Sequence, residues 1–305
     1  MATATTPLPS RAIFALAVLS LIWGYSWIAT KIGLAYADPL SFSALRIGLG
    51  ALCLFLTLFL LAKPWKPARP LAILGLGLLQ TTGFVGFSVW ATSQGGAGRT
   101  AILVFTMPLW TMLLAWPLLG ERLQRLHWLI ATIACAGLSL ILQSTSAGSE
   151  PALHSKVLAV LSGFCWAAGS IAFKRLQRVT PLDPLSITAW QMLFGALPLV
   201  AAALVQPNAH VQWTPAFTMS IAYNAVLTTA AGWWLWVYVL KLLPTSVASL
   251  SMFAVPVIAL MLSWSLMGER ITPLEGFGIA LLSIALLLLS IGPQRLQQIF
   301  ASLRD

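Results

Sequence analysis

Two tryptophans occupy matching positions in the two halves of the chain, each near the middle of a long apolar run. Trp23 and Trp166 are 143 residues apart, and Lys31 and Lys174 repeat that separation. An indole N–H buried among apolar groups needs a hydrogen-bond partner. The pair therefore indicates either helix packing or an aromatic wall on which a ligand's ring or alkyl chain stacks, with Tyr25 and Trp27 extending the wall.

Polar residues gather at the centres of two further apolar runs. Gln80 and Thr81 lie in one run, and Thr228 lies at the corresponding depth of the other, one turn after Tyr223 and Asn224. Such a girdle indicates either hydrogen bonding between helices or contacts to the polar end of a neutral or zwitterionic ligand. The candidate ligand contacts are Trp23, Tyr25, Gln80, Thr81, Phe84, Trp166, Tyr223, Asn224 and Thr228.

A longer motif occurs once in each half: Pro, eleven residues, then Gly-Glu-Arg, with Trp at the same internal position. A proline inside a helix removes one backbone donor and frees a carbonyl, so each proline predicts a kink and possible hinge. The Glu-Arg pairs predict either ion pairing that fixes the helix ends or alternating gates. The hinge and gate candidates are Pro108, Pro256, Glu121, Arg122, Glu269 and Arg270.

Arg46 is the charged residue that lies well inside an apolar run, opposite the neutral Gln191 of the other half. A charge at the centre of a bilayer costs about 2.5–3.5 kcal/mol on the insertion scale. The side chain therefore either extends outward to the membrane interface or faces an internal cavity and binds a carboxylate.

These residues lie in a chain built for a lipid environment. Of 305 residues, 59% are hydrophobic and 8% are charged, against about 25% charged in soluble domains. This composition predicts an integral membrane protein and excludes DNA-binding, disordered and disulfide-scaffold proteins. Lys and Arg concentrated in cytoplasmic loops explain the net charge of +10 without a nucleic-acid partner.

Ten apolar runs are long enough to span a bilayer as helices, and they show no period-2 alternation. Counting Lys and Arg places twelve on the side of the chain ends and four on the other, which predicts cytoplasmic N- and C-termini. The predicted spans are 12–34, 40–62, 70–92, 97–119, 124–143, 155–177, 185–205, 217–241, 244–267 and 273–292.

The matching motifs divide the chain into two repeats of five spans, residues 1–147 and 148–305. Because five is odd, the second repeat must enter the membrane from the opposite side. The predicted fold is an all-α polytopic membrane protein of ten helices in two inverted repeats. Transporters with this plan place their substrate near the bilayer midplane, between the repeats, and work by alternating access.

Several chemistries lack their motifs in this sequence. No P-loop, HExxH or metal-ligand spacing is present, and the acidic residues lie in loops or at span ends. We therefore expect no enzyme activity, no cofactor and no metal, and we hypothesise facilitated diffusion or exchange without a buried carboxylate relay.

The pattern resembles the EamA family of the drug/metabolite transporter superfamily. The resemblance rests on Trp-Gly-Tyr-Ser-Trp (23–27), the paired Pro–Gly-Glu-Arg motifs and the duplicated ten-span layout, and it covers nearly the whole chain. It implies an exporter or facilitator of metabolites in the bacterial inner membrane, with the aromatic amino acid exporters as the nearest branch. It also implies that spans one, three, six and eight line the pathway.

The sequence thus predicts alternating-access transport of small metabolites, above all amino acids with aromatic or hydrophobic side chains. The alternatives are export of amphipathic drugs, quaternary amines or nucleosides, a channel, and a membrane enzyme or structural subunit without a transport cycle. The expected partners are a small-molecule substrate and the lipid bilayer, and the oligomeric state, monomer or homodimer, is left open.

Overall fold

Helices account for nearly all of the regular structure. The computed structural model describes residues 10–121, 123–143, 153–179, 182–207, 209–243 and 252–291. In these ranges there is no β-strand, only one isolated bridge between Ala37 and Val211. The predicted all-α fold is confirmed.

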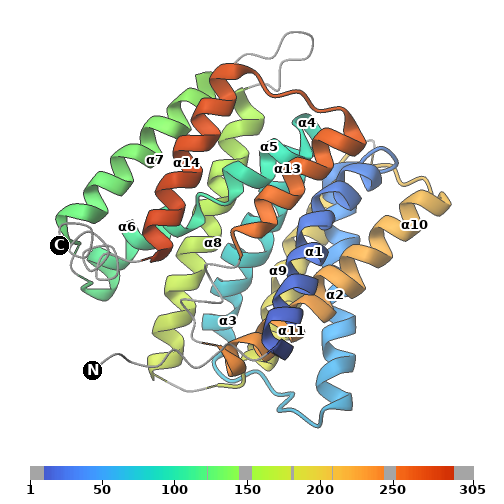
Figure 1. The fold of residues 1–305 in the computed structure, drawn as a ribbon. Helices are drawn as coiled ribbons and strands as arrows, with labels where there is room; N and C mark the ends of the chain where they lie inside the picture. The colour runs from blue at the N-terminus through green and yellow to red at the C-terminus, as the bar shows by residue number, and fades with distance from the viewer. Residues whose placement is uncertain are drawn as a thin grey trace.

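The described helices follow one another as apolar segments joined by short connections (Figure 1). Seven stretches are long and apolar enough to cross a membrane, and two of these, Pro70–Gln94 and Ala97–Leu119, combine shorter helices. The helices are α1 (Ser10–Gly33), α2 (Pro39–Leu60), α3 (Pro70–Leu76), η1 (Gly77–Gly83), α4 (Phe84–Gln94), α5 (Ala97–Val104), α6 (Met107–Leu119), α7 (Arg125–Gln143), α8 (Leu153–Val179), α9 (Pro184–Val205), α10 (Pro215–Ala222), η2 (Tyr223–Ala231), α11 (Gly232–Leu242), α13 (Ala254–Met267) and α14 (Pro273–Ile291).

These elements agree with the predicted layout of about ten spans. The eighth predicted span corresponds to α10, η2 and α11 in sequence, and the tenth to α14. The ninth is described from residue 252 onward, and the predicted repeat boundary at 147/148 lies outside the described residues.

Two helices begin with the same four residues, Asp-Pro-Leu-Ser, one in each half. Asp38 caps α2 by accepting from the backbone N–H of Ser41 at 2.9 Å, and Asp183 caps α9 through Ser186 at 3.1 Å. The proline at the first helical position has no N–H to satisfy, so both starts are favourable. Burial alone would raise the pKa of Asp38, but the N–H groups of Ser41 and His210 lower it below its usual value.

The fourth span is interrupted where its proline predicts. Helix α5 ends at Val104 and α6 begins at Met107, with Pro108 in its first turn. In the other half Pro256 lies in the first turn of α13. Helices α6 and α13 both end at the glycine of the Gly-Glu-Arg motif, which adopts the left-handed conformation that helix C-caps favour. The φ angles are 70° at Gly120 and 67° at Gly268.

The third and eighth spans each contain a π-helical centre, which the sequence analysis did not predict. Segments η1 and η2 hold the two polar clusters, and π-helical turns are frequently found at functional sites. At η1 the backbones pack so closely that a Cβ on Gly77 would lie 2.5 Å from the Gln191 carbonyl oxygen. At η2 Thr229 donates to the carbonyl of Asn224 at 2.9 Å.

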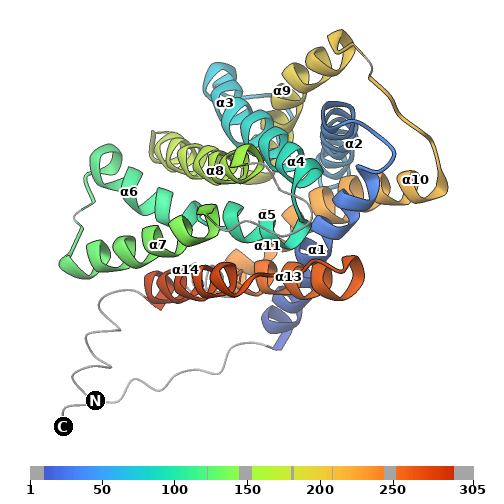
Figure 2. The same cartoon turned by 90° about the horizontal axis from the view of Figure 1, so that it is seen from above.

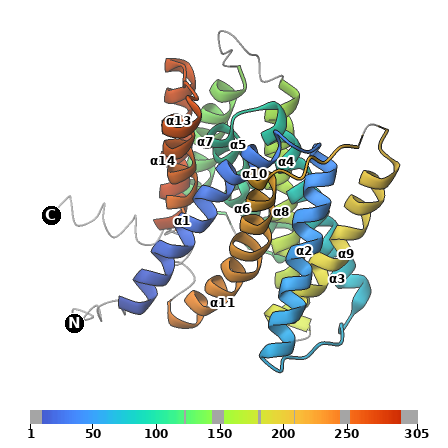
Figure 3. The same cartoon turned by 90° about the vertical axis from the view of Figure 1, so that its right-hand side faces the viewer.

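The two halves pack against each other through pairs of equivalent helices. Helix α2 packs on α9, and α7 packs on α14 (Figures 2 and 3). The contacts of α1 with α13 and α11 are matched by those of α8 with α6 and α4. Helices α1 and α8 begin at opposite ends of the bundle (Figure 1). Equivalent helices that run in opposite senses and pack about a pseudo-two-fold axis are the inverted-repeat arrangement.

Close packing at small residues repeats this symmetry. A Cβ on Gly50 would lie 2.7 Å from Thr229, and one on Gly195 would lie 2.4 Å from Thr81. Small residues allow helices to approach closely in a bilayer, where packing replaces the hydrophobic driving force. The perimeter keeps large apolar side chains exposed, including Leu71 at 82%, as a lipid-facing surface does.

Candidate functional site

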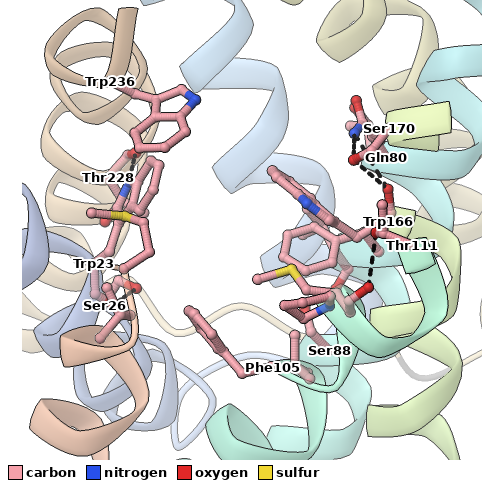
Figure 4. Close-up of a pocket in the computed structure, with 18 of the residues that line it drawn as sticks. Trp23, Ser26, Gln80, Ser88, Phe105, Thr111, Trp166, Ser170, Thr228 and Trp236 are labelled. Carbon is pink, nitrogen blue, oxygen red and sulfur yellow. Dashed lines mark hydrogen bonds between the residues drawn. The ribbon is translucent and has the colours of Figure 1, made fainter. Parts of the chain in front are cut away.

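A cavity of about 640 Å³ lies between the two halves (Figure 4). Its volume is within the range of small-molecule sites, about 300–1,000 Å³. The helices that supply its wall include the first, third, sixth and eighth spans. Six of the nine predicted ligand contacts line it: Trp23, Gln80, Thr81, Phe84, Trp166 and Thr228.

Aromatic rings from both halves form a continuous wall on the cavity. The rings of Trp166 and Phe84 have centroids 4.6 Å apart, and Trp233 lies 5.8 Å from Trp166 and 6.5 Å from Trp23. The indole N–H of Trp23 donates to the carbonyl of Thr228 at 3.1 Å. The wall thus provides a stacking surface, and the half-buried Trp23 indole in it has its hydrogen-bond partner on η2.

Polar side chains from η1 and η2 face the same cavity. Gln80 donates from Nε2 to the hydroxyl of Ser170 at 3.1 Å. The hydroxyls of Thr81 and Thr228 are buried and have no hydrogen-bond partner in the described structure. Buried hydroxyls normally have a partner, so these two oxygens are available to a ligand or to water in the cavity.

The other three predicted contacts do not line the cavity. Tyr25 and Tyr223 pack edge to face with centroids 5.1 Å apart, and the Tyr223 hydroxyl donates to the carbonyl of Ile22 at 2.9 Å. Asn224 donates to Ser220 at 3.0 Å. Tyr223 and Asn224, the first two residues of η2, thus contact α1 in place of the cavity. The sequence analysis assumed a regular helix there.

Arg46 lines the cavity from α2. Its Nη1 donates to the hydroxyl of Thr30 at 3.4 Å, and its Nε is buried without a partner. The hydroxyl of Thr30 in turn donates to Oδ1 of Asn224 at 3.3 Å. Of the two expectations for this residue, the structure shows the internal position.

A network of polar contacts among largely half-buried side chains closes one end of the cavity, which we call the sealed end. Lys31 donates to the carbonyls of Thr92 at 2.9 Å and Gly95 at 2.7 Å, which caps the end of α4. Glu269 accepts from the backbone N–H of Ala97, at the start of α5, at 2.5 Å. These contacts join α1, α4, α5 and α13 across the mouth.

The same network includes an ion pair, between Arg99 of α5 and the fully buried Glu275 of α14. The side chain of Arg99 is 13% exposed, and its guanidinium also donates to the carbonyl of Arg270 at 2.8 Å. The sealed end is therefore fastened by charge as well as by packing.

The opposite end, which we call the open end, is built from equivalent residues in a different state. Glu121 lines the cavity there and pairs with Lys174 at 2.6 Å, and both side chains are about half exposed. His127 also lines this end. Of the remaining gate candidates, Arg122 lies outside the described residues, Pro108 lines the main cavity, and Pro256 lines a neighbouring cavity of about 100 Å³.

The cavity offers a ligand aromatic stacking, hydrogen bonds and the positive charge of Arg46. Within the described ranges no three His, Cys, Asp or Glu side chains come together as metal ligands. Of the aromatic lining residues that the sequence analysis missed, Trp233 and Trp236 are the two whose rings pack on Trp23. Their signal was present as Gly-Trp-Trp-Leu-Trp (232–236), which follows the polar cluster of η2 directly.

Comparison with known proteins gives consistent matches over the whole chain. The model of the EamA-like transporter family matches residues 10–143 and again 155–291. The uncharacterized transporter YoaV of Bacillus subtilis is 28% identical over 258 residues, covering 83% of this chain and 88% of the relative. A protein of Salmonella typhimurium named "Probable amino-acid metabolite efflux pump" is 28% identical, covering 87% of this chain and 90% of its own.

A solved crystal structure has the same fold. It superposes with a TM-score of 0.65 at 19% identity, covering 94% of this chain and 99% of the other. The family model matches each half separately, at 10–143 and 155–291, which agrees with the duplication seen in the motifs and the helix packing.

Proposed function

Since the chain belongs to the EamA-like transporter family, we propose that it exports amino acids with aromatic or hydrophobic side chains by alternating access through the central cavity. The predicted family membership is confirmed, and the protein is a multi-pass membrane transporter of small molecules. The name of the Salmonella typhimurium relative supports the amino-acid class for that protein. For this chain the proposed substrate class is argued from the residues that line the cavity.

One observation carries the proposal: the cavity lies between inverted halves, and equivalent residues close one end and leave the other exposed. Lys31 and Glu269 are half-buried at the sealed end, whereas their equivalents Lys174 and Glu121 are exposed at the open end. In an inverted repeat each half can adopt the other's conformation, so this asymmetry is reversible. This asymmetry supports alternating access.

The aromatic wall supports a substrate with a flat or branched apolar body. Trp23, Phe84 and Trp166 present ring faces and edges to the cavity, and aromatic pairs contribute about 0.5–1.5 kcal/mol beyond area burial. Gln80 and the free hydroxyls would hold the polar end of the substrate.

The proposed location is the bacterial inner membrane, with both chain ends in the cytoplasm. This orientation follows from the distribution of Lys and Arg in the sequence. It makes the open end cytoplasmic, the side from which an exporter takes its substrate.

Reconstitution in liposomes tests the proposal. We expect saturable, stereoselective counterflow of L-phenylalanine or L-leucine, and a KM raised about tenfold in Trp166→Ala if one stacking contact of about 1.4 kcal/mol is lost. Trp90→Ala is the matched control, because Trp90 lies outside the cavity wall. Flux that never saturates would indicate a channel, and turnover of a lipid or peptide without flux would indicate an enzyme.

We propose that transport proceeds by facilitated diffusion or exchange, without a relay of buried carboxylates. The polar groups at the middle of the cavity are amides, hydroxyls and Arg46, while Glu121 and His127 lie at the open end. Proton relays in membranes use titratable groups along the pathway. Substrate-driven proton flux in sealed liposomes would contradict this part of the proposal.

A further inference from the structure

Arg46 is a half-buried cation on the cavity wall, and no described carboxylate forms an ion pair with it. The ion pairs in the described ranges use Lys63, Arg99 and Lys174, all at the ends of the helices. The hydrogen bond from Arg46 to Thr30 is long at 3.4 Å, and the Nε atom has no partner. A guanidinium stays charged at physiological pH and presents five donors in a fixed fork. Most of these donors are left for another group.

Packing alone does not require a cation at this position. The equivalent residue of the other half is Gln191, which is neutral and 2% exposed in the matching interface of α9 with η1. The fold thus accommodates a neutral side chain at the position in the second half that is equivalent to Arg46. The charge in the first half therefore calls for a different explanation.

The surroundings of Arg46 point to a ligand anion. Arg46, Thr81 and Thr228 line the same cavity, and each has a buried nitrogen or oxygen without a partner. The two threonines are 1% and 7% exposed. Unpaired buried polar groups are costly, so these three side chains favour a ligand that brings hydrogen-bond partners into the cavity.

The chemistry of a guanidinium selects the ligand group. Its planar fork matches a carboxylate in a bidentate, charge-assisted pair. Like-charge repulsion in a cavity of low dielectric would disfavour a quaternary ammonium placed nearby. The aromatic wall accepts the apolar remainder of the molecule.

We propose that Arg46 binds the carboxylate of the transported solute, so that the cavity selects amphipathic carboxylates and rejects quaternary amines. Thr30 acts as a positioning residue for the guanidinium. This inference rests on the proposed function, because it names the group that recognises the substrate within the same cavity.

Calorimetric titration of the full-length protein in detergent tests the inference with matched probes. These are 3-phenylpropanoate, L-phenylalanine, L-phenylalaninamide and phenethyltrimethylammonium, which share a phenyl ring and differ in the polar end. We expect the two carboxylates to bind at least about tenfold more tightly than the amide and the quaternary amine, as one charge-assisted pair provides.

Variants locate the effect. Arg46→Gln should weaken carboxylate binding at least about tenfold and leave amide binding within about threefold. Arg46→Lys should be intermediate, because it keeps the charge and loses the fork. Lys63→Gln is the control: it removes a cation whose side chain is 40% exposed and which does not line the cavity, and binding should not change.

Each outcome is decisive. Equal affinity for the acid and the amide, or carboxylate binding unchanged in Arg46→Gln, would overturn the inference. If Arg46→Gln does not fold, as judged by size-exclusion chromatography, the wild-type comparison of acid with amide and the Arg46→Lys titration decide. Saturable flux of cations or neutral solutes with no carboxylate preference would overturn this inference but leave transport standing. Absence of saturable flux for every solute, with carboxylate binding retained, would instead refute the proposed function.

Discussion

The two ends of the cavity are made of equivalent residues in opposite states. At the sealed end Lys31 caps α4 and Glu269 caps α5, with Glu275 fully buried nearby. At the open end Lys174 and Glu121 form a pair in which both side chains are about half exposed. Exposed pairs contribute about 0–1 kcal/mol, whereas breaking a buried one costs about 3–5 kcal/mol. The Lys and Glu of the repeated motif are therefore in different states at the two ends, and the sealed end adds a buried ion pair, between Arg99 and Glu275.

The largest effect is expected from Glu275→Gln, which leaves Arg99 without its counter-charge. We expect the sealed end to lose about 3 kcal/mol of stabilisation and to open. The measurement is maleimide labelling of Ser88→Cys, a buried cavity residue, from the sealed side of oriented vesicles. The labelling background has Cys53, Cys135 and Cys165 replaced.

Glu121→Gln is the matched control at the open end, because it removes an exposed pair worth about 0–1 kcal/mol. If both variants labelled at the wild-type rate, the ion pair at the sealed end would not be what holds it closed.

Pro108→Ala and Pro256→Ala test whether these prolines act as hinges when the sealed end of the cavity opens and the open end closes. Restoring a backbone donor near Val104 should straighten the fourth span and slow exchange between the two states, because the break between α5 and α6 lies on the cavity wall. We expect transport to fall about tenfold, equivalent to 1.4 kcal/mol in the barrier, with expression nearly unchanged. Unaltered kinetics in both variants would rule out a hinge.

Gly120→Ala and Gly268→Ala distinguish the cost of local backbone strain from an effect on closure of the sealed end of the cavity. Both positions have positive φ and no atom within 4 Å of an added Cβ, so each substitution should cost roughly 1 kcal/mol by the same backbone mechanism. Only Gly268→Ala should also displace Glu269 from α5 and increase the Ser88→Cys labelling. Thermal unfolding in detergent compares the stability costs, and equal labelling in the two variants would contradict the difference between the ends.

The smallest effect is expected on the pH dependence of the stability of the fold. Burial tends to raise the pKa of Asp38 and of Asp183, but hydrogen bonds and, for Asp183, the neighbouring Lys63 hold both below the usual value. Their stabilisation is therefore present above the unfolded pKa, about 3.9, and is lost as pH falls through the lower folded values. Asp38→Asn and Asp183→Asn should each flatten the acid limb of the unfolding profile. If both variants had the same acid limb as the wild-type protein, these two aspartates would not contribute to stability in this way.

Features with a strong local signal were predictable from the sequence. Apolar runs gave the spans, and Pro108 marked the break in the fourth span because proline lacks a backbone donor at any site. Trp23 and Trp166 were recognised through their repeat spacing. Both line the cavity because the pseudo-two-fold axis brings equivalent positions together.

Features that depend on close packing between distant segments were not predictable. Tyr223 and Asn224 are held by contacts with Ile22 and Thr30 of α1, respectively 201 and 194 positions earlier in the chain, rather than facing the cavity. The capping of α4 by Lys31 joins residues more than 60 apart in sequence. Such pairings require the three-dimensional arrangement of the helices.

Paired distance measurements by pulsed electron resonance test alternating access most directly. One spin-label pair, at Ala35 and Leu153, spans α1 and α8 at the sealed end, and a second, at Arg11 and Arg178, spans the same helices at the open end. With saturating amounts of a solute shown to be transported, we expect the open-end distance to shorten and the sealed-end distance to lengthen in populations that change together. Distances that stay fixed at both ends, or that widen at both ends at once, would contradict a cavity reached from one side at a time.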